Sequence, residues 1–98
     1  MTFELAFLEP ALKEWKKLDR TVRDQFKARL AERLENPRIP SAKLHGHPDR
    51  YKIKLRSVGY RLVYKVRESE VVVLVVAVGR RERDAVYLAA MRRSRDTR

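Results

Sequence analysis

Lysine and arginine side chains suited to binding phosphate recur at every second position in part of the sequence. Lys52, Lys54 and Arg56 alternate with apolar residues in one predicted strand, and Arg61 does so in the next. Because the apolar faces of both strands must coincide, a tight turn places Arg61 opposite either Lys54 or Arg56. Both registers gather four cations on one face, where opposed like charges destabilise a sheet by about 0.2 kcal/mol or more. The face is either simply solvated or, as we favour, bound to a polyanion such as a phosphodiester backbone.

A phosphodiester can be cleaved without metal if a base activates the nucleophile, an acid protonates the leaving oxygen and cations hold the phosphoryl charge. RNA supplies its own nucleophile, the 2′-OH. Tyr87 is the candidate base because it follows Arg80, Arg81 and Arg83. Neighbouring cations favour the phenolate and lower the pKa of a tyrosine from its usual value of about 10. The competing interpretation is a tyrosine that only packs an amphipathic helix.

Other acid–base candidates fit less well. His45 and His47 could supply two metal ligands, but no third ligand is near and their Gly/Pro-rich surroundings indicate a surface loop. Glu82 and Asp84 stand among arginines, as expected of counter-charges or of acids in the first turn of a helix. We therefore expect neither a metal nor a cofactor.

The first half of the sequence predicts a strand and two helices. Alternation over residues 3–7 indicates a short strand, and Pro10 suits the first turn of a helix. Thr21 and Asp24 resemble a capping box for a second helix, which ends at Asn36 before a proline.

The second half predicts three strands and a final helix. After a connecting loop over 37–49, strands are expected over 51–56 and 60–65. The run 71–78 is β-branched and apolar on both faces, which is typical of a central strand covered on both sides. A last helix is expected over 84–93. The predicted fold class is α+β: a compact single domain of order β-α-α-β-β-β-α, with an antiparallel sheet core packed by two N-terminal helices and a C-terminal helix.

Length and composition agree with one small basic domain over residues 1–98. The chain carries 24 Lys and Arg against 13 Asp and Glu, a net charge of +11, and no cysteine. The lack of cysteine excludes disulfides, thiolate metal sites and a Cys nucleophile. Residues 50–98 hold 14 basic and 5 acidic side chains, or +9 of that charge, and residues 92–98 look like a frayed basic tail. The longest apolar run is too short to cross a membrane and no signal peptide is apparent, so we expect a cytoplasmic protein with no membrane partner.

Three motifs in combination closely resemble the RelE family, toxins of bacterial type II toxin–antitoxin systems within the RelE/ParE superfamily. They are Asp49 to Arg56, Gly59 to Tyr64, and Gly79 to Arg83 leading to Val86-Tyr87. The stretches 11–15 and 36–39 are similar too, so the resemblance spans roughly residues 3–93. It therefore covers every predicted element.

The resemblance implies a ribosome-dependent mRNA interferase, an endoribonuclease that inhibits translation by cutting mRNA in the ribosomal A site. The 2′-OH would attack the adjacent phosphate and leave 2′,3′-cyclic phosphate and 5′-OH ends. The family's active-site set falls on Lys52, Lys54, Arg61, Arg81 and Tyr87. It implies Tyr87 as base, and Arg61 and Arg81 as stabilisers of the phosphoryl centre. The acid is either Lys54 or Arg81, and we favour Lys54 because the pKa of a lysine can fall among neighbouring cations whereas a guanidinium hardly deprotonates. Arg56, Arg80 and Arg83 are expected to help bind substrate.

The implied partners are a RelB-like antitoxin that neutralises the toxin, the mRNA, and the ribosome at the A site of its small subunit. Operator DNA would be contacted through the antitoxin. The alternatives are a non-catalytic basic module that binds RNA or DNA, a degenerate toxin that retains only antitoxin binding, and a relative that acts on free mRNA.

Overall fold

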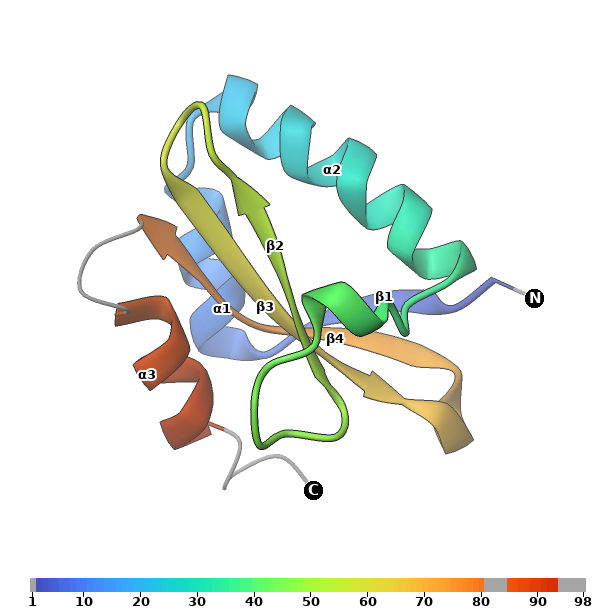
Figure 1. Ribbon diagram of the computed structural model, residues 1–98. Helices are drawn as coiled ribbons and strands as arrows, with labels where there is room; N and C mark the ends of the chain where they lie inside the picture. Colours follow the sequence, from blue (N-terminus) through green and yellow to red (C-terminus); the bar gives the residue numbers. More distant parts are fainter. Residues whose placement is uncertain (1, 81–84, 94–98) are drawn as a thin grey trace.

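The computed structural model describes residues 2–80 and 85–93, which form one sheet and the helices around it (Figure 1). The order of elements confirms the predicted β-α-α-β-β-β-α succession. The elements are β1 (Glu4–Phe7), α1 (Glu9–Lys16), α2 (Arg20–Glu35), β2 (Arg50–Leu55), β3 (Tyr60–Arg67), β4 (Val72–Arg80) and α3 (Ala85–Arg93), with 3₁₀ turns η1 (Pro40–Ala42) and η2 (Glu68–Glu70). Within the described ranges, no helix is long and apolar enough to cross a membrane.

The sheet has the order β1-β4-β3-β2 and is mixed. β2 pairs with β3 and β3 with β4 in antiparallel fashion, whereas β1 pairs with β4 in parallel, with Leu5 beside Val73. The prediction of a purely antiparallel core is therefore wrong for β1. Alternating residues look the same in either direction, and the direction of β1 depends on how α1 and α2 return the chain to the sheet.

β4 is the covered central strand that its apolar sequence predicts. It lies between β1 and β3, and its residues from Val73 to Val78 are buried. α1 and α2 cover one face of the sheet, where Phe26 packs into the larger core. α3 covers the other face, where Val86 packs against Val76 in a smaller cluster (Figure 1).

The β2–β3 hairpin adopts one of the two predicted registers. Lys54 lies opposite Arg61 and Leu55 lies opposite Tyr60. The connecting turn closes with a 2.9 Å hydrogen bond from the Gly59 N–H to the Leu55 carbonyl. Gly59 has a φ of 71°, a conformation that favours glycine.

Two details of the predicted boundaries are wrong. α2 has Asp19, without a side-chain cap, before its first residue Arg20, so Thr21 and Asp24 form no capping box. Val71 has a φ of 55° in the turn before β4 and is not part of the strand. β4 continues through Gly79 to Arg80, and a Cβ atom at Gly79 would lie in van der Waals contact with Val86 Cγ2 of α3, at 3.4 Å.

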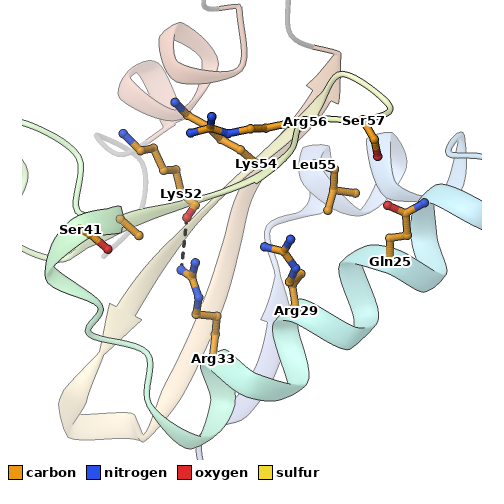
Figure 2. Close-up of a pocket in the computed structure, with 10 residues that line it drawn as sticks. Gln25, Arg29, Arg33, Ser41, Lys52, Lys54, Leu55, Arg56 and Ser57 are labelled. Carbon is orange, nitrogen blue, oxygen red and sulfur yellow. Dashed lines mark hydrogen bonds between the residues drawn. The ribbon is translucent and has the colours of Figure 1, made fainter.

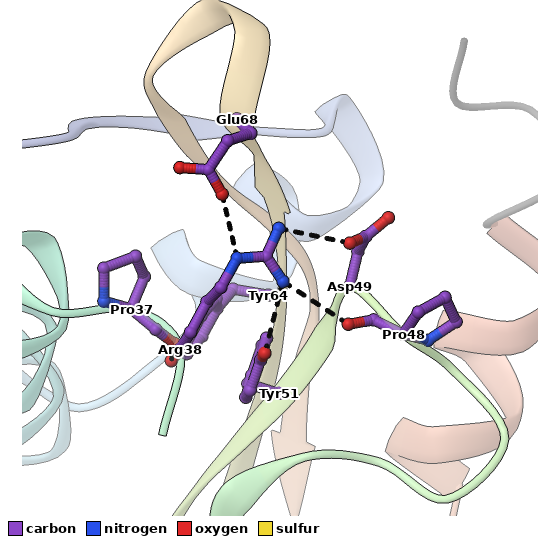
Figure 3. A network of polar contacts seen from close by, with 7 residues as sticks. All are labelled: Pro37, Arg38, Pro48, Asp49, Tyr51, Tyr64 and Glu68. Carbon is purple, nitrogen blue, oxygen red and sulfur yellow. Dashed lines mark hydrogen bonds and ion pairs between the residues drawn. The ribbon is translucent and has the colours of Figure 1, made fainter. Parts of the chain in front are cut away.

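The loop after α2 is held by a polar network around Arg38 (Figure 3). The guanidinium donates to Glu68 at 2.8 Å, to Asp49 at 3.2 Å and to the Tyr51 hydroxyl at 3.3 Å. These hydrogen bonds raise the pKa of Arg38 above its already high value. The network connects the end of α2 to the start of β2 and the end of β3. It therefore holds the start of β2 against the loop after α2.

Candidate active site

Arg61 and Tyr87 meet on the sheet face that α3 covers. The guanidinium carbon of Arg61 lies 5.0 Å from the centroid of the Tyr87 ring, within the range of a cation–π contact. Both residues are half-buried. The predicted base and one predicted phosphoryl-binding cation, which come from α3 and β3, are therefore adjacent.

α3 is placed by its apolar side. Val86 and Ala90 are buried, one helical turn apart, against Val63, Val76 and Ala77 of the sheet. Tyr87 follows Val86 and lies at the edge of this contact, only partly buried. Packing of the small cluster thus determines where the Tyr87 hydroxyl can lie.

A second anchor of α3 is an ion pair between Arg93 and Glu14. Two guanidinium nitrogens of Arg93 donate to the two carboxylate oxygens, each at 2.9 Å. Arg93 also donates to the Val76 carbonyl at 2.9 Å, and Glu14 accepts the Val78 N–H at 3.1 Å. β1 pairs with β4 only as far as Val75, so the ion pair supplies hydrogen bonds to β4 beyond the end of β1. Its hydrogen bonds raise the pKa of Arg93.

This anchor departs from the sequence pattern in two ways. Helical periodicity places Glu14 on the outward face of α1, but it is half-buried between α1, β4 and α3. Arg92 and Arg93, which the charge count assigns to a tail, lie inside α3. The rest of that tail, residues 94–98, lies outside the described residues.

Lys52 and Lys54 share the face of Arg61, as the alternation predicts. Lys54 is directly opposite Arg61, Lys52 is opposite Val63, and both lysines are half-buried. Lys54, Arg56, Tyr60 and Arg61 are among the residues that line a small pocket of about 170 Å³. The three predicted catalytic residues of the hairpin are thus together, and Arg61 connects them to Tyr87.

The same like-charge face continues toward the other end of the hairpin. Arg50 is opposite Lys65 and is buried, with a relative exposure of 8%. Burial lowers the pKa of Arg50 against the opposing effect of Asp49. Burial, followed by the charges of Arg50 and Arg67, lowers the pKa of Lys65.

A larger groove lies between α2 and β2 (Figure 2). Its volume is about 500 Å³, and Lys52, Lys54 and Arg56 belong to its lining. Arg29 and Arg33 of α2 also line it, although neither is among the site residues that the sequence predicts. The available signal was their spacing with Gln25, since residues four apart share one side of a helix.

The predicted substrate-binding arginines have different positions. Arg56 is exposed in the hairpin turn and lines the groove. Arg80 ends β4 with its guanidinium carbon 5.4 Å from the centroid of the Tyr60 ring, so it lies over Tyr60. Arg81 and Arg83, with Glu82 and Asp84, lie outside the described residues.

The histidines lie in a loop, as predicted. His45 is exposed and His47 half-buried in the turn region before β2. Within residues 2–80 and 85–93, no group of three His, Cys, Asp or Glu side chains is arranged to hold a metal ion.

Comparison with known proteins identifies the family. A family model described as the ParE toxin of the type II toxin–antitoxin system parDE matches residues 5–85. The chain is 59% identical over 93 residues to the mRNA interferase toxin RelE of Escherichia coli K12, covering 95% of this chain and 98% of the relative. The chain belongs to the RelE family of type II toxins.

Solved structures of RelE toxins share the fold. An arginine-to-alanine variant of E. coli RelE in the free state superposes with a TM-score of 0.88 at 57% identity, covering 95% of this chain and 98% of that one. E. coli RelE in the intact RelBE toxin–antitoxin complex gives a TM-score of 0.79 at 60% identity, covering 83% and 99%. The family model ends at residue 85, before Tyr87, whereas the full-length RelE relatives align over nearly the whole chain.

Proposed function

We propose that this chain is a ribosome-dependent mRNA interferase that cuts mRNA in the ribosomal A site. The observation that carries the proposal is the contact of Arg61 with Tyr87, directly beside Lys54. A phenol, a guanidinium and an ammonium in one place meet the requirements of metal-free phosphodiester cleavage. Relatives at 59% identity are named mRNA interferases, which supports RNA as the substrate.

In the proposed reaction, the Tyr87 phenolate takes the proton of the 2′-OH while the 2′-oxygen attacks the adjacent phosphorus. Arg61, joined by Arg81, stabilises the charge of the pentavalent phosphoryl centre. The bond from phosphorus to the 5′-oxygen breaks as Lys54 donates a proton to that oxygen. Lys52 adds positive charge beside Lys54 and binds phosphate. The products are a 2′,3′-cyclic phosphate and a 5′-OH end.

Dependence on the ribosome follows from the residues available. The proposed base and acid are a phenol and an ammonium, whose ordinary pKa values of about 10 lie above neutral pH. Such groups need an RNA held with its 2′-OH in line with the phosphorus, and orientation of this kind lowers a barrier substantially. In the proposed reaction the ribosome orients the codon in its A site, so the proposed place of action is the cytoplasm.

The proposed inhibitor is a RelB-like antitoxin. Solved structures pair E. coli RelE with RelB and with a RelB peptide, at 60% and 58% identity to this chain. A strongly basic toxin favours a partner with acidic segments. Contact with operator DNA is proposed to occur through the antitoxin.

The test is a single-turnover assay on ribosomes programmed with a defined A-site codon. We expect one cut in that codon and a 2′,3′-cyclic phosphate on the upstream fragment. Tight ribosome binding without a new RNA end would favour a non-catalytic module. Equal cleavage of the same mRNA without ribosomes would contradict ribosome dependence.

A further inference from the structure

The groove between α2 and β2 carries more positive charge than the proposed reaction uses. Arg29 and Arg33 point toward β2 from α2, and Lys52, Lys54 and Arg56 also belong to the lining, with side chains that extend from the hairpin away from α2 (Figure 2). The ten described residues that line it include no Asp or Glu. Such a concentration of like charge is costly in the absence of an anion.

The two α2 arginines differ in their attachment to the fold. Arg33 is half-buried and donates to the Tyr64 hydroxyl at 2.9 Å and to the Lys52 carbonyl at 3.2 Å. Its guanidinium is therefore held at the groove. Arg29 is exposed one turn earlier on the same side of the helix, so its charge is directly available to a ligand.

We propose that this groove binds the phosphate backbone of the mRNA next to the bond that is cut. The inference rests on the proposed function, because Lys52 and Lys54 belong both to the groove and to the proposed reaction centre. A strand whose scissile phosphate lies at Lys54 and Arg61 passes into the groove beside Lys52. Arg29 and Arg33 then neutralise phosphates that take no part in the reaction.

The lining favours a nucleic acid over an acidic peptide. Its apolar members, Leu55 and Ala42, are only 3% and 7% exposed, so a peptide would find little apolar surface to bury against. Protein interfaces depend on such buried apolar contacts at their centre. The remaining lining consists of guanidinium, ammonium, amide and hydroxyl groups, which are donors suited to phosphate oxygens.

The test measures binding of a short single-stranded 2′-O-methyl RNA, which cannot be cut, by fluorescence anisotropy at about 50 to 200 mM KCl. Arg29→Gln is the main variant because the side chain is exposed and its loss spares the core. Arg33→Gln is the second variant, with its fold checked by thermal unfolding. Lys27→Gln is the matched control: Lys27 is exposed on α2, does not line the groove, and loses the same charge.

We expect Arg29→Gln to weaken RNA binding about threefold to tenfold and to reduce the slope of log K against log salt by about 0.7, the value for one phosphate contact to a single strand. Lys27→Gln should change affinity by about twofold at most. Equal effects of the two substitutions would overturn the proposal, because the loss of one positive charge anywhere on the surface would then explain both results. The proposal would also be overturned if Arg29→Gln weakened the binding of a glutamate-rich peptide but left RNA binding unchanged.

The RNA-binding and cleavage experiments together test the groove and the proposed function separately. If wild-type protein cuts mRNA on ribosomes but Arg29→Gln binds RNA like the control, only the groove is contradicted. If wild-type protein fails to cut while Arg29→Gln still weakens RNA binding, the groove is supported and the proposed reaction is contradicted.

Discussion

The two ends of the β2–β3 hairpin use arginine in opposite ways. At one end Arg38 bonds to two carboxylates and a hydroxyl, so its charge is neutralised within the fold (Figure 3). At the other end Arg61 lies over the ring of Tyr87 and directly opposite Lys54, which concentrates positive charge. Arg38, with its acidic partners, therefore stabilises the fold, whereas Arg61 gathers positive charge beside the proposed base.

Tyr87→Phe is expected to have the largest effect. It removes the proposed base but keeps the ring under Arg61, so the rate of cleavage should fall by about 100-fold or more, the usual scale for one acid–base group. Single-turnover cleavage on programmed ribosomes measures it, with ribosome binding as the control. A rate within a few fold of wild type would remove Tyr87 from the reaction.

Glu14→Gln tests whether the catalytic end depends on the anchor of α3. The neutral amide weakens the bonds to Arg93 and Val78, and hydrogen bonds to charged groups are worth about 1.5 to 3 kcal/mol before allowance for partial exposure. We expect faster hydrogen exchange over residues 85–93 and a modest loss of cleavage rate. Glu9→Gln, at an exposed position of α1, is the control. Unchanged exchange in α3 would show that the apolar cluster alone holds the helix.

Tyr64→Phe tests the structural end of the hairpin. The Tyr64 hydroxyl donates to the Pro37 carbonyl at 2.6 Å and accepts from Arg33, so its loss should lower the free energy of unfolding by about 1 to 2 kcal/mol at neutral pH. Urea unfolding measures this. Cleavage should fall much less than in Tyr87→Phe.

The same variant has a distinct pH dependence. Burial raises the pKa of Tyr64 above 10.0, so the folded state favours the neutral phenol. That contribution to stability is complete below the unfolded pKa of about 10 and is lost as pH rises through the folded pKa. The stability difference between wild type and Tyr64→Phe should therefore narrow above pH 10. A constant difference would contradict the effect of burial. Lys65, whose pKa is lowered, is present in both proteins and cancels.

Arg38→Met should have the smallest effect. The side chain is 39% exposed, so solvent screens its ion pairs with Asp49 and Glu68, and we expect a loss of about 1 kcal/mol of stability. Arg20→Met is the control, because Arg20 is 90% exposed and lies 4.0 Å from Asp24. Cleavage should stay within about twofold of wild type, since the network lies at the far end of β2 from Lys54. A large loss of cleavage with unchanged stability would contradict the division between the two ends.

Local patterns allowed most of the fold to be predicted. Alternation in the hairpin restricted Lys54 and Arg61 to one face because a one-residue slip would expose the apolar side chains. The continuous apolar run predicted a central β4, since only a strand covered on both faces buries every side chain. The parallel direction of β1 was missed because an edge strand of alternating residues carries no sign of its partner's direction.

The candidate site, like the fold, was predicted from the sequence only in part. Its residue types were visible in the sequence, whereas the position of Arg29 and Arg33 beside β2 was missed because their helix carries charges of both signs. The burial of Glu14 was missed because the periodicity of α1 gives no information about β4. The Glu14 carboxylate accepts a hydrogen bond from the Val78 N–H of that strand.

The amino-acid sequence alone indicates the kind of ligand that this protein can bind: its net charge and the alternation of its cations favour a polyanion, and its lack of cysteine excludes thiol chemistry. Which of those cations act together depends on the tertiary structure. The contact of Arg61 with Tyr87 joins β3 to α3 through packing on the sheet, and the groove joins α2 to β2. Both depend on long-range burial of apolar surface, which is non-directional, so no local motif specifies them.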